Sequence, residues 1–326
     1  MATLTNIAIT GGSGHLGSCL IQLLLLQGYS VNALYTQKLP NKTNKNLTWI
    51  KGDINDGTAI KTLINGSSVL IHCAGLISIG NKKTDEVYRV NVTGTKTIVN
   101  ECLKASKIRL IHISSSNAVI ETNTTEIFDE NRPYKTKRDF TYPYTKAKAE
   151  KHVLKAISKN DLDAIIIRPT SIVGIPDYKP SLLGQTILDI KNAKIPAITN
   201  GGYNLVDVRD LSQTIINSIK KAKSGEIYLV GGEYLTVKEI AKVAYPTRTP
   251  IQISLDLLLI LMPFINVYQK LFKLKWPVTK ESIVTLKLAP KNMDISKAQK
   301  ELNHTCRPIK ESITDFIEWT EQNKNL

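Results

Sequence analysis

The first two thirds of the chain alternate short, continuously apolar runs with longer segments whose apolar residues recur at helical spacing. Continuously apolar runs are typical of strands buried on both faces of a parallel sheet, and the periodic segments are typical of the helices that cover it. The runs predict strands at residues 6–10, 30–35, 48–51, 69–73, 109–114 and 163–168. The periodic segments predict helices at residues 16–27, 58–64, 85–106 and 142–159.

After residue 170 the pattern becomes less regular. Glycine and proline cluster between 174 and 180, and predicted helices at 182–193 and 208–222 precede a strand at 226–230. From there to residue 326 the chain is predicted to be mostly helical. The expected fold class is α/β, a doubly wound parallel sheet with a smaller, mostly helical C-terminal domain. We expect residues 1–170 and 204–231 to form the sheet domain, and residues 171–203 and 232–326 to form the second domain.

One stretch, residues 255–272, is apolar enough to suggest contact with a membrane. Its longest unbroken apolar run, 257–265, contains Pro263 and is shorter than the about 20 residues that a spanning helix needs. We therefore predict no transmembrane span. A helix that lines an apolar pocket or a subunit contact is the first interpretation, and shallow association with a membrane surface is the second.

The composition narrows the class of protein. Hydrophobic residues make up 42% of the chain and charged residues 22%, which is typical of a soluble globular enzyme and excludes a disordered chain. Four cysteines without a closely spaced pair exclude a disulfide scaffold and a zinc ribbon, so we expect a cytoplasmic protein without a metal site. The net charge of +15 comes mainly from scattered lysines, which favours a solvated basic surface over a nucleic-acid interface.

A glycine-rich turn follows the first predicted strand and opens the first predicted helix. Its sequence is Thr10-Gly11-Gly12-Ser13-Gly14-His15-Leu16-Gly17, which fits two dinucleotide patterns, one starting at Gly11 and the other at Gly12. Glycines at such a turn let the backbone approach a pyrophosphate, whose charge is stabilised by the helix N-terminus. The turn therefore predicts a Rossmann-type dinucleotide site, with contacts from Gly11, Ser13, Gly14, His15, Leu16 and Gly17.

The residues after the second predicted strand indicate which dinucleotide binds. A site selective for NAD usually offers a carboxylate about 20 residues after the glycine turn, which binds the ribose 2′-hydroxyl. The first acidic residue of this chain is Asp53, whereas Thr36, Lys38 and Lys42 stand where a 2′-phosphate would lie. Because a lysine neutralises a phosphate, NADP is the expected cofactor and NAD is the alternative.

A tyrosine and a lysine four residues apart begin the helix predicted at 142–159. Tyr142 and Lys146 share one helical face, where the ammonium is expected to lower the pKa of the phenol from its ordinary value of about 10. Upstream, the strand predicted at 109–114 leads into Ser114-Ser115-Ser116-Asn117, at the sheet edge where ligands bind. A serine hydroxyl there would hold a substrate carbonyl while the tyrosine exchanges a proton with it.

Further motifs follow in a recognisable order along nearly the whole chain. They are Gly52-Asp53-Ile54, His72-Cys73-Ala74-Gly75, Asn91-Val92-Thr93-Gly94-Thr95, Arg168-Pro169-Thr170-Ser171-Ile172-Val173-Gly174, Asp207-Val208-Arg209-Asp210 and Asp294-Ile295-Ser296-Lys297-Ala298. With the glycine turn and the tyrosine–lysine pair, these motifs make the chain resemble the extended short-chain dehydrogenase/reductase superfamily. Within it, the chain is most similar to the dihydroflavonol-reductase-like and 3β-hydroxysteroid-dehydrogenase-like branch.

The resemblance implies roles for several residues. Tyr142 would be the general acid or base, and Lys146 would bind the nicotinamide ribose and lower the tyrosine pKa. Ser116, with Ser115 as the alternative, would orient the carbonyl. The other implied cofactor contacts are Asp53 and Ile54 near the adenine, Ala74 and Gly75 near the ribose, and Pro169 to Ile172 near the nicotinamide amide. Asn91 is expected to be structural, Thr36 stands where NADP-binding relatives often carry arginine, and a homodimer is the habit of the family.

Three functions are compatible with these residues. The first is an NADPH-dependent oxidoreductase that reduces a ketone or aldehyde of a small apolar substrate, or oxidises the alcohol in reverse. The alternative is an NAD-dependent nucleotide-sugar 4-epimerase, which the Arg168-Pro169-Thr170-Ser171 motif and the missing carboxylate disfavour. A cofactor-binding protein without turnover is disfavoured because Ser116, Tyr142 and Lys146 are all present. A sugar 4,6-dehydratase would carry an acidic pair where this chain has Asn117-Ala118, so that function is excluded.

Overall fold

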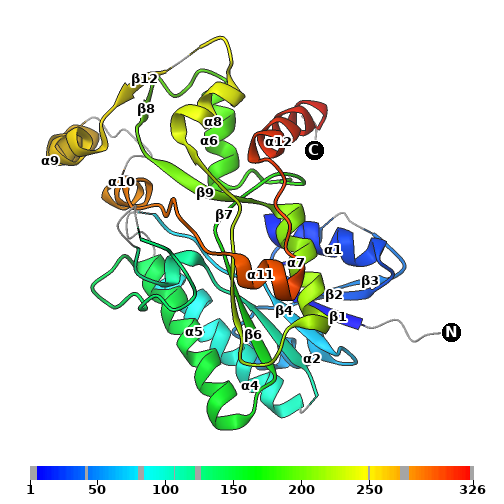
Figure 1. Ribbon diagram of the computed structural model, residues 1–326. Coiled ribbons are helices and arrows are strands. Elements are labelled where there is room, and N and C mark those ends of the chain that lie inside the picture. Colours follow the sequence, from blue (N-terminus) through cyan, green and yellow to red (C-terminus); the bar gives the residue numbers. More distant parts are fainter. Residues whose placement is uncertain are drawn as a thin grey trace.

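The computed structural model describes residues 6–40, 43–79, 84–105, 107–121, 126–248, 250–271 and 279–323. At its centre is a parallel sheet of seven strands (Figure 1). In spatial order these are β10 (Ile227–Val230), β6 (Ala164–Pro169), β5 (Arg109–Ile113), β4 (Val69–His72), β1 (Asn6–Thr10), β2 (Ser30–Tyr35) and β3 (Leu47–Lys51). The chain builds outward from β1 to β3 and then adds β4, β5, β6 and β10 on the other side of β1. This switch point leaves a crevice at the carboxyl ends of β1 and β4, where open α/β sheets bind ligands.

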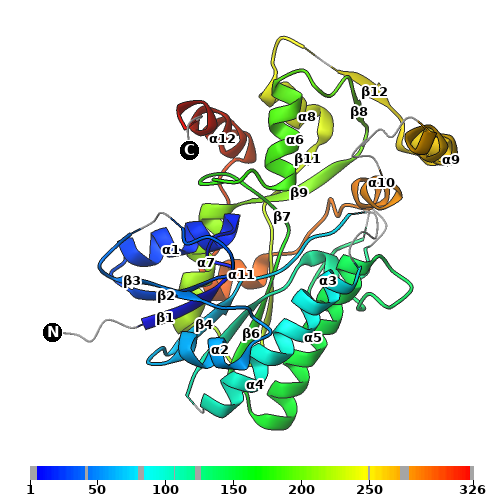
Figure 2. The ribbon, with the colours of Figure 1, turned by 180° about the vertical axis from the view of Figure 1, so that it is seen from behind.

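Helices cover both faces of this sheet, as Figure 1 and Figure 2 show from opposite sides. One face carries α1 (His15–Leu26), α7 (Val208–Lys221) and α11 (Ser296–Leu302). The other carries α2 (Gly57–Ile64), α4 (Thr95–Ala105) and α5 (Thr141–Asn160). Each face has its own apolar core, because successive strand side chains point to opposite sides of the sheet. Ile7 and Ile9 accordingly belong to one core and Ala8 to the other.

The prediction of an α/β fold with a doubly wound parallel sheet is confirmed, and the predicted sheet strands agree with the observed ones to within one residue at either end. The helix predicted at 85–106 is instead divided into α3 (Thr84–Tyr88), a π-helical turn η1 (Arg89–Gly94) and α4, and residue 106 lies outside the described residues. π-helical turns often lie at functional sites. This one carries Asn91, whose Oδ1 accepts a hydrogen bond from the backbone N–H of Leu76 at 2.8 Å in the loop after β4.

A second group of elements lies above the carboxyl edge of the large sheet in Figure 1. Its strands are β7 (Ser171–Val173), β9 (Gly202–Asp207) and β11 (Glu233–Thr236) in one sheet, and β8 (Ala197–Thr199) with β12 (Ile251–Ile253) in another. Its helices are α6 (Leu182–Lys191), α8 (Val237–Ala244), α9 (Leu255–Leu271), α10 (Lys280–Lys287) and α12 (Ile309–Gln322). The prediction of a mostly helical C-terminal part missed these short strands. The division into two domains at the predicted boundaries stays a prediction.

Helix α9 coincides with the apolar stretch seen in the sequence, except for residue 272, which lies outside the described residues. Within the described ranges of the chain, no helix combines the length and the hydropathy that crossing a bilayer requires.

Candidate active site

The glycine turn connects β1 to α1 at the switch point of the sheet. Gly11 has a φ angle of +71°, and a Cβ atom there would lie 2.7 Å from the backbone nitrogen of Ala74. A Cβ atom on Gly17 would lie 2.1 Å from the carbonyl oxygen of Gly11, so neither position accepts a larger residue. Gly14 occupies the N-cap of α1 and has no side chain to bind the first amides of the helix, which leaves them to a ligand. The turn therefore fits a dinucleotide pyrophosphate.

A buried histidine holds this turn against the neighbouring loop. Nδ1 of His72 lies 2.7 Å from Oγ1 of Thr10, and its Nε2 lies 3.1 Å from Oγ1 of Thr95. The same Thr10 oxygen accepts a hydrogen bond from the backbone N–H of Ala74 at 3.3 Å. Burial lowers the pKa of His72 to about 3, so the neutral ring donates with one nitrogen and accepts with the other. The sequence did not indicate this bridge, because its partners come from β1, β4 and α4.

Helix α5 carries Tyr142 in its first turn and Lys146 one turn later. Lys146 is 6% exposed, and its Nζ donates a hydrogen bond to the carbonyl oxygen of Ile113 at 2.7 Å, at the end of β5. Burial lowers the pKa of Lys146 to about 8, and the carboxylate of Glu150 offsets part of that shift. Burial also raises the pKa of Tyr142, and its side-chain hydrogen bond with Ser115 acts in the opposite direction. Burial therefore has the largest effect on the pKa of Tyr142. The sequence analysis had expected the ammonium of Lys146 to lower this pKa, but that ammonium is hydrogen-bonded to the backbone of β5.

The two candidate serines take different positions. Ser115 precedes the short 3₁₀ turn η2 (Ser116–Ala118), where its Oγ accepts a hydrogen bond from the backbone N–H of Asn117 at 3.1 Å. Ser115 is also the serine whose side chain hydrogen-bonds with Tyr142. Ser116 instead lies on the wall of a neighbouring cleft. The structure therefore pairs the tyrosine with the second choice from the sequence, because the turn directs consecutive side chains to different sides.

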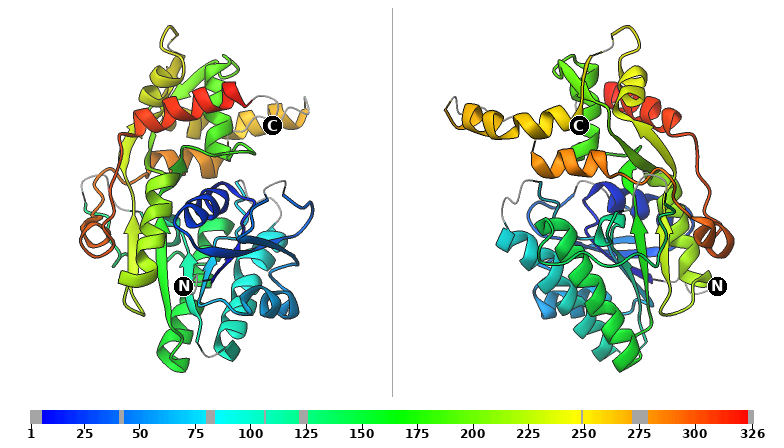
Figure 3. Two further views of the ribbon diagram at one scale, coloured as in Figure 1. Left: turned by 90° about the vertical axis from the view of Figure 1, so that its right-hand side faces the viewer. Right: turned by 60° about the vertical axis from the view of Figure 1, so that its left-hand side comes forward.

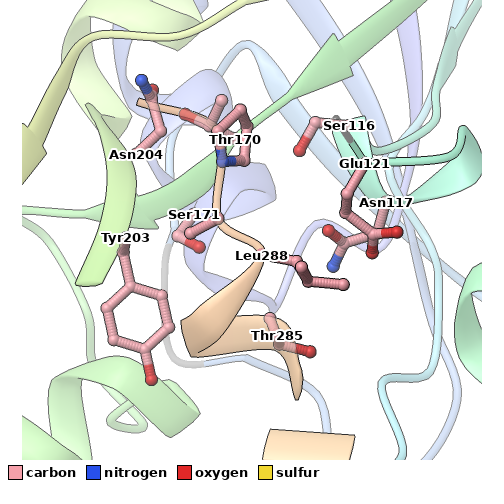
Figure 4. A pocket seen from close by; sticks show the side chains of 11 residues that line it. Ser116, Asn117, Glu121, Thr170, Ser171, Tyr203, Asn204, Thr285 and Leu288 are labelled. Carbon is pink, nitrogen blue, oxygen red and sulfur yellow. The ribbon is translucent and has the colours of Figure 1, made fainter. Parts of the chain in front are cut away.

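The cleft beside Ser116 is shown in Figure 4. Its polar lining includes Asn117, Thr170, Ser171, Tyr203 and Asn204, and its apolar lining consists of Leu288, Ala289 and Pro290. Oγ1 of Thr170 is buried without a hydrogen-bond partner among the described residues. Burial raises the pKa of Tyr203 to about 12, so its hydroxyl stays protonated at neutral pH. The cleft thus combines one apolar wall with several hydrogen-bonding groups.

A buried ion pair ties α5 to the sheet beneath the site. Arg168 on β6 donates hydrogen bonds to the carboxylate of Glu150, one of them from Nε to Oε1 at 2.9 Å. The same carboxylate accepts hydrogen bonds from Oγ of Ser114 at 2.6 Å and from the hydroxyl of Tyr134 at 2.7 Å. The side chains of Arg168 and Glu150 are only 1% and 0% exposed. Because Glu150 lies one turn beyond Lys146, this network holds the tyrosine-bearing end of α5 against β5 and β6.

The residues predicted to select the cofactor lie at the ends of β2 and β3. Thr36 and Lys38 follow β2 and are exposed, while Lys42 lies outside the described residues. Asp53, which follows β3, forms an ion pair with Arg89 at 3.1 Å. Arg89 thus compensates the negative charge of Asp53, which is the first acidic residue in the sequence.

The remaining candidates lie around the same crevice. A Cβ atom on Gly75 would lie 3.7 Å from Nζ of Lys146, so the loop after β4 passes next to the lysine. Nε2 of His15 lies 2.9 Å from the carbonyl oxygen of Gly174, which links the glycine turn to the end of β7. Of the others, Ser13 is exposed, Leu16 and Ile54 are buried, Pro169 ends β6 and Ile172 lies in β7. The structure thus brings the glycine turn, the lysine and the serines to one edge of the sheet.

The lowered pKa of Lys146 predicts how stability depends on pH. Below pH 8 the lysine is protonated in the folded and the unfolded chain alike, and the full penalty for burying its charge is present. Between its pKa of about 8 in the folded chain and its ordinary value of 10.5, the unfolded chain binds more protons, so the free energy of unfolding rises with pH. Relative to Lys146→Met, we expect the wild type to gain about 1.5 kcal/mol from pH 8 to about pH 9.5. Urea unfolding across this range measures the gain, and parallel profiles for the two proteins would contradict it.

A dinucleotide turn at the switch point, with a tyrosine, a lysine and serines at the same sheet edge, is the arrangement of the extended short-chain dehydrogenases and reductases. Comparison with known families refines that class: the chain belongs to the 3-beta hydroxysteroid dehydrogenase/isomerase family, which it matches over residues 8–225. It is therefore an oxidoreductase that acts on CH–OH or C=O groups, in a family whose members bind NAD or NADP.

Relatives with curated names agree with this assignment. The chain is 33% identical over 237 residues to "Sterol demethylase protein B" of Methylococcus capsulatus, which covers 71% of each chain. It is 30% identical over 324 residues to a "Putative dihydroflavonol 4-reductase" of Synechocystis, which covers 95% of this chain and 93% of the relative. It is 31% identical over 217 residues to the human "Sterol-4-alpha-carboxylate 3-dehydrogenase, decarboxylating", which covers 66% of this chain and 57% of the relative.

Solved structures share the whole fold. The crystal structure of the protein called gox2253 superposes with a TM-score of 0.83 at 26% identity, over 99% of both chains. The UDP-glucose 4-epimerase of Thermotoga maritima superposes with a TM-score of 0.79 at 16% identity, over 98% of this chain and 100% of that one. At that identity the second likeness concerns the fold alone.

Proposed function

We propose that this chain is an NADP(H)-dependent oxidoreductase that reduces a ketone or aldehyde of a small apolar substrate and oxidises the alcohol in reverse. The observation that carries the proposal is the position of Tyr142 at the edge of the sheet. Its hydroxyl shares a hydrogen bond with Ser115, and the buried Lys146 lies one helical turn away. A proton donor, a carbonyl-orienting hydroxyl and a cation beside a dinucleotide turn are the groups that such a reduction needs.

The dinucleotide would be held by the residues named from the sequence, and when bound it supplies the hydride for the substrate carbon. The residues that would hold the phosphates are Gly11, Ser13, Gly14, His15, Leu16 and Gly17, and those at the 2′-phosphate are Thr36 and Lys38. Asp53 and Ile54 would contact the adenine. Ala74, Gly75 and Lys146 would contact the ribose, and Pro169 and Ile172 the nicotinamide. Lys146 and the glycine turn both border the loop that contains Gly75, so ribose and pyrophosphate would bind along a single loop.

The side chains of the protein itself account for the proton transfer. Burial keeps the pKa of Tyr142 above its ordinary value, so the phenol is protonated at neutral pH and is suited to donate a proton to the carbonyl oxygen. The Ser115 hydroxyl would orient that oxygen by donating a hydrogen bond to it. In the reverse direction the phenolate accepts the proton of the alcohol.

The preference for NADP rests on charge. No acidic residue precedes Asp53 in the sequence, and Asp53 is already paired with Arg89. A 2′-phosphate would therefore meet the exposed Lys38 without facing an uncompensated carboxylate, whereas a 2′-hydroxyl would lack its usual acidic partner.

The substrate class rests on the cleft and on the relatives. Leu288, Ala289 and Pro290 form the apolar part of the lining of the cleft that also contains Ser116. The names of the similar proteins refer to sterols and a dihydroflavonol, which are largely apolar ring compounds with a hydroxyl or carbonyl group. A nucleotide sugar would require more compensation of charge than this lining offers.

Calorimetric titration of nucleotide-free protein with NADPH and with NADH tests the proposal. We expect much tighter binding of NADPH, followed by oxidation of NADPH in the presence of apolar ketones or aldehydes. Protein that purifies with NAD bound, and that interconverts nucleotide sugars without net oxidation of cofactor, would instead support the epimerase.

Exchanging the two serines separately tests which of them orients the carbonyl. Ser115→Ala is expected to lower kcat by about 10²-fold, because it removes the hydrogen bond shared with Tyr142 and the donor to the carbonyl oxygen. Ser116→Ala is the matched control and is expected to change KM more than kcat, since Ser116 lines the cleft. Steady-state kinetics on one substrate compare them, and the reverse ranking would return the role to Ser116.

A further inference from the structure

Helix α9 presents a continuous apolar stripe to solvent. On a helical wheel with about 100° per residue, six of its side chains fall within an arc of about 120°. They are Leu257, Ile260, Leu261, Phe264, Val267 and Leu271, with exposed fractions between 39% and 72%. We refer to these six residues as the α9 stripe. Large apolar side chains grouped in this way on a protein surface mark an interaction site.

The opposite face of α9 is fixed to the protein. Leu255 and Met262 are buried together with Ile283 of α10. The partly buried residues packed against this cluster are Leu258, Leu259, Ile265 and Leu286. Helix α9 therefore cannot turn its stripe inward without breaking the contact with α10. Figure 3 shows α9 reaching outward from the body of the molecule, with α10 beside it.

The sequence around the stripe is basic. Between residues 255 and 287 it contains five lysines, at 270, 273, 275, 280 and 287, and two acidic residues, Asp256 and Glu281. The chain as a whole has a formal charge of +15. An anionic surface attracts such a protein, and lysines near an apolar helix face are typical of helices that lie in the headgroup region of a bilayer.

We propose that the α9 stripe inserts into the headgroup region of an anionic lipid surface, with α9 lying along the membrane and not across it. The apolar stripe supplies the buried area, and the net positive charge of the chain supplies the attraction. A second copy of the chain fits less well, because a stable dimer buries about 800 Å² on each partner, contributed by about 20–30 residues. The stripe consists of six side chains on one helix that reaches outward (Figure 3), which a flat and deformable lipid surface accepts more readily.

Lipid binding would bring the cleft close to the membrane. Thr285 of α10 and Leu288 at its end line the cleft, while Ile283 of the same helix anchors α9. An apolar substrate dissolved in the bilayer would then have a short path to the serine run. This consequence rests on the proposed function, whereas binding to lipid does not.

Flotation of the purified full-length protein with vesicles tests the proposal. With vesicles of phosphatidylcholine and phosphatidylglycerol we expect the wild type to float, and with phosphatidylcholine alone we expect weaker binding. The double variant Ile260→Gln/Phe264→Gln is expected to lower the vesicle partition coefficient by about tenfold or more, because it removes two apolar side chains from the buried face. The matched control Leu26→Gln/Ile127→Gln removes two similarly exposed side chains elsewhere and is expected to bind as the wild type does.

Several results would overturn the proposal. Wild-type protein that stays out of the floating fraction with both kinds of vesicle would do so, and so would equal flotation of the stripe and control variants. A dimer that dissociates in the stripe variant, measured by sedimentation without any vesicle binding, would assign the stripe to a second copy of the chain. Circular dichroism and NADPH titration of the same variants separate a folding defect, or a failure of the proposed function, from a loss of lipid binding.

Discussion

Tyr142→Phe is expected to lower kcat/KM for the carbonyl substrate by about 10²- to 10⁴-fold, the range typical of a general acid. The variant keeps the aromatic ring in the first turn of α5 but loses the hydroxyl that shares a hydrogen bond with Ser115. The affinity for NADPH is expected to stay unchanged, because the residues that would hold the dinucleotide are intact. Stopped-flow or steady-state oxidation of NADPH measures the first quantity, and calorimetry measures the second.

Tyr144→Phe is the matched control for this result. Tyr144 lies two residues further along the same helix, and its hydroxyl accepts a hydrogen bond from Nζ of Lys148 at 3.3 Å, outside the site. Its removal is expected to leave kcat/KM nearly unchanged. If both variants retained wild-type turnover, Tyr142 would not be the proton donor and the proposed mechanism would be wrong.

Glu150→Gln is expected to lower the free energy of unfolding by about 3–5 kcal/mol, the usual loss when one partner of a buried ion pair is removed. The substitution leaves the guanidinium of Arg168 without its counter-ion at a position that is only 1% exposed. It also weakens the acceptor used by Ser114 and Tyr134. Urea unfolding measures the change, and the loosened end of α5 is expected to lower turnover as well.

Two further variants serve as controls for Glu150→Gln. Lys194→Gln removes one partner of an ion pair with Asp189 in which the lysine is 67% and the aspartate 30% exposed, and it is expected to cost no more than about 1 kcal/mol. Glu150→Gln/Arg168→Met removes both buried charges and is expected to recover part of the lost stability. A loss for Glu150→Gln as small as that for Lys194→Gln would mean that the buried network does not stabilise the fold.

The large sheet could be predicted because its strands are buried on both faces. A strand such as β6, with the residues Ala164-Ile165-Ile166-Ile167, is buried at every position and is therefore apolar throughout this run. The glycine turn was equally visible, because the positive φ of Gly11 and the close approach at Gly17 exclude other residues.

The strands of the second part were not visible in the same way. Strand β9 pairs with β7 on one side and with β11 on the other, and these partners lie on either side of it in the sequence. Strands such as β9, which contains Asn204 and Asp207, lack the continuous apolar run of the central strands. Their pairing depends on contacts with distant segments. The same holds for the outward position of α9, which the apolar sequence alone did not distinguish from a buried helix.

The amino-acid order determined where the candidate residues lie within their own elements. Tyr142 and Lys146 share a helical face at any tertiary arrangement, and the serine run must lie where β5 ends. Which serine meets the tyrosine depended on the turn that follows β5, and the partner of the Lys146 ammonium depended on how α5 docks on the sheet. The bridge through His72 and the pair between Glu150 and Arg168 likewise join residues from separate elements. Spacing along the chain determines which side chains share a face within one element. Burial, shifts of pKa and contacts between elements depend on how the elements pack together.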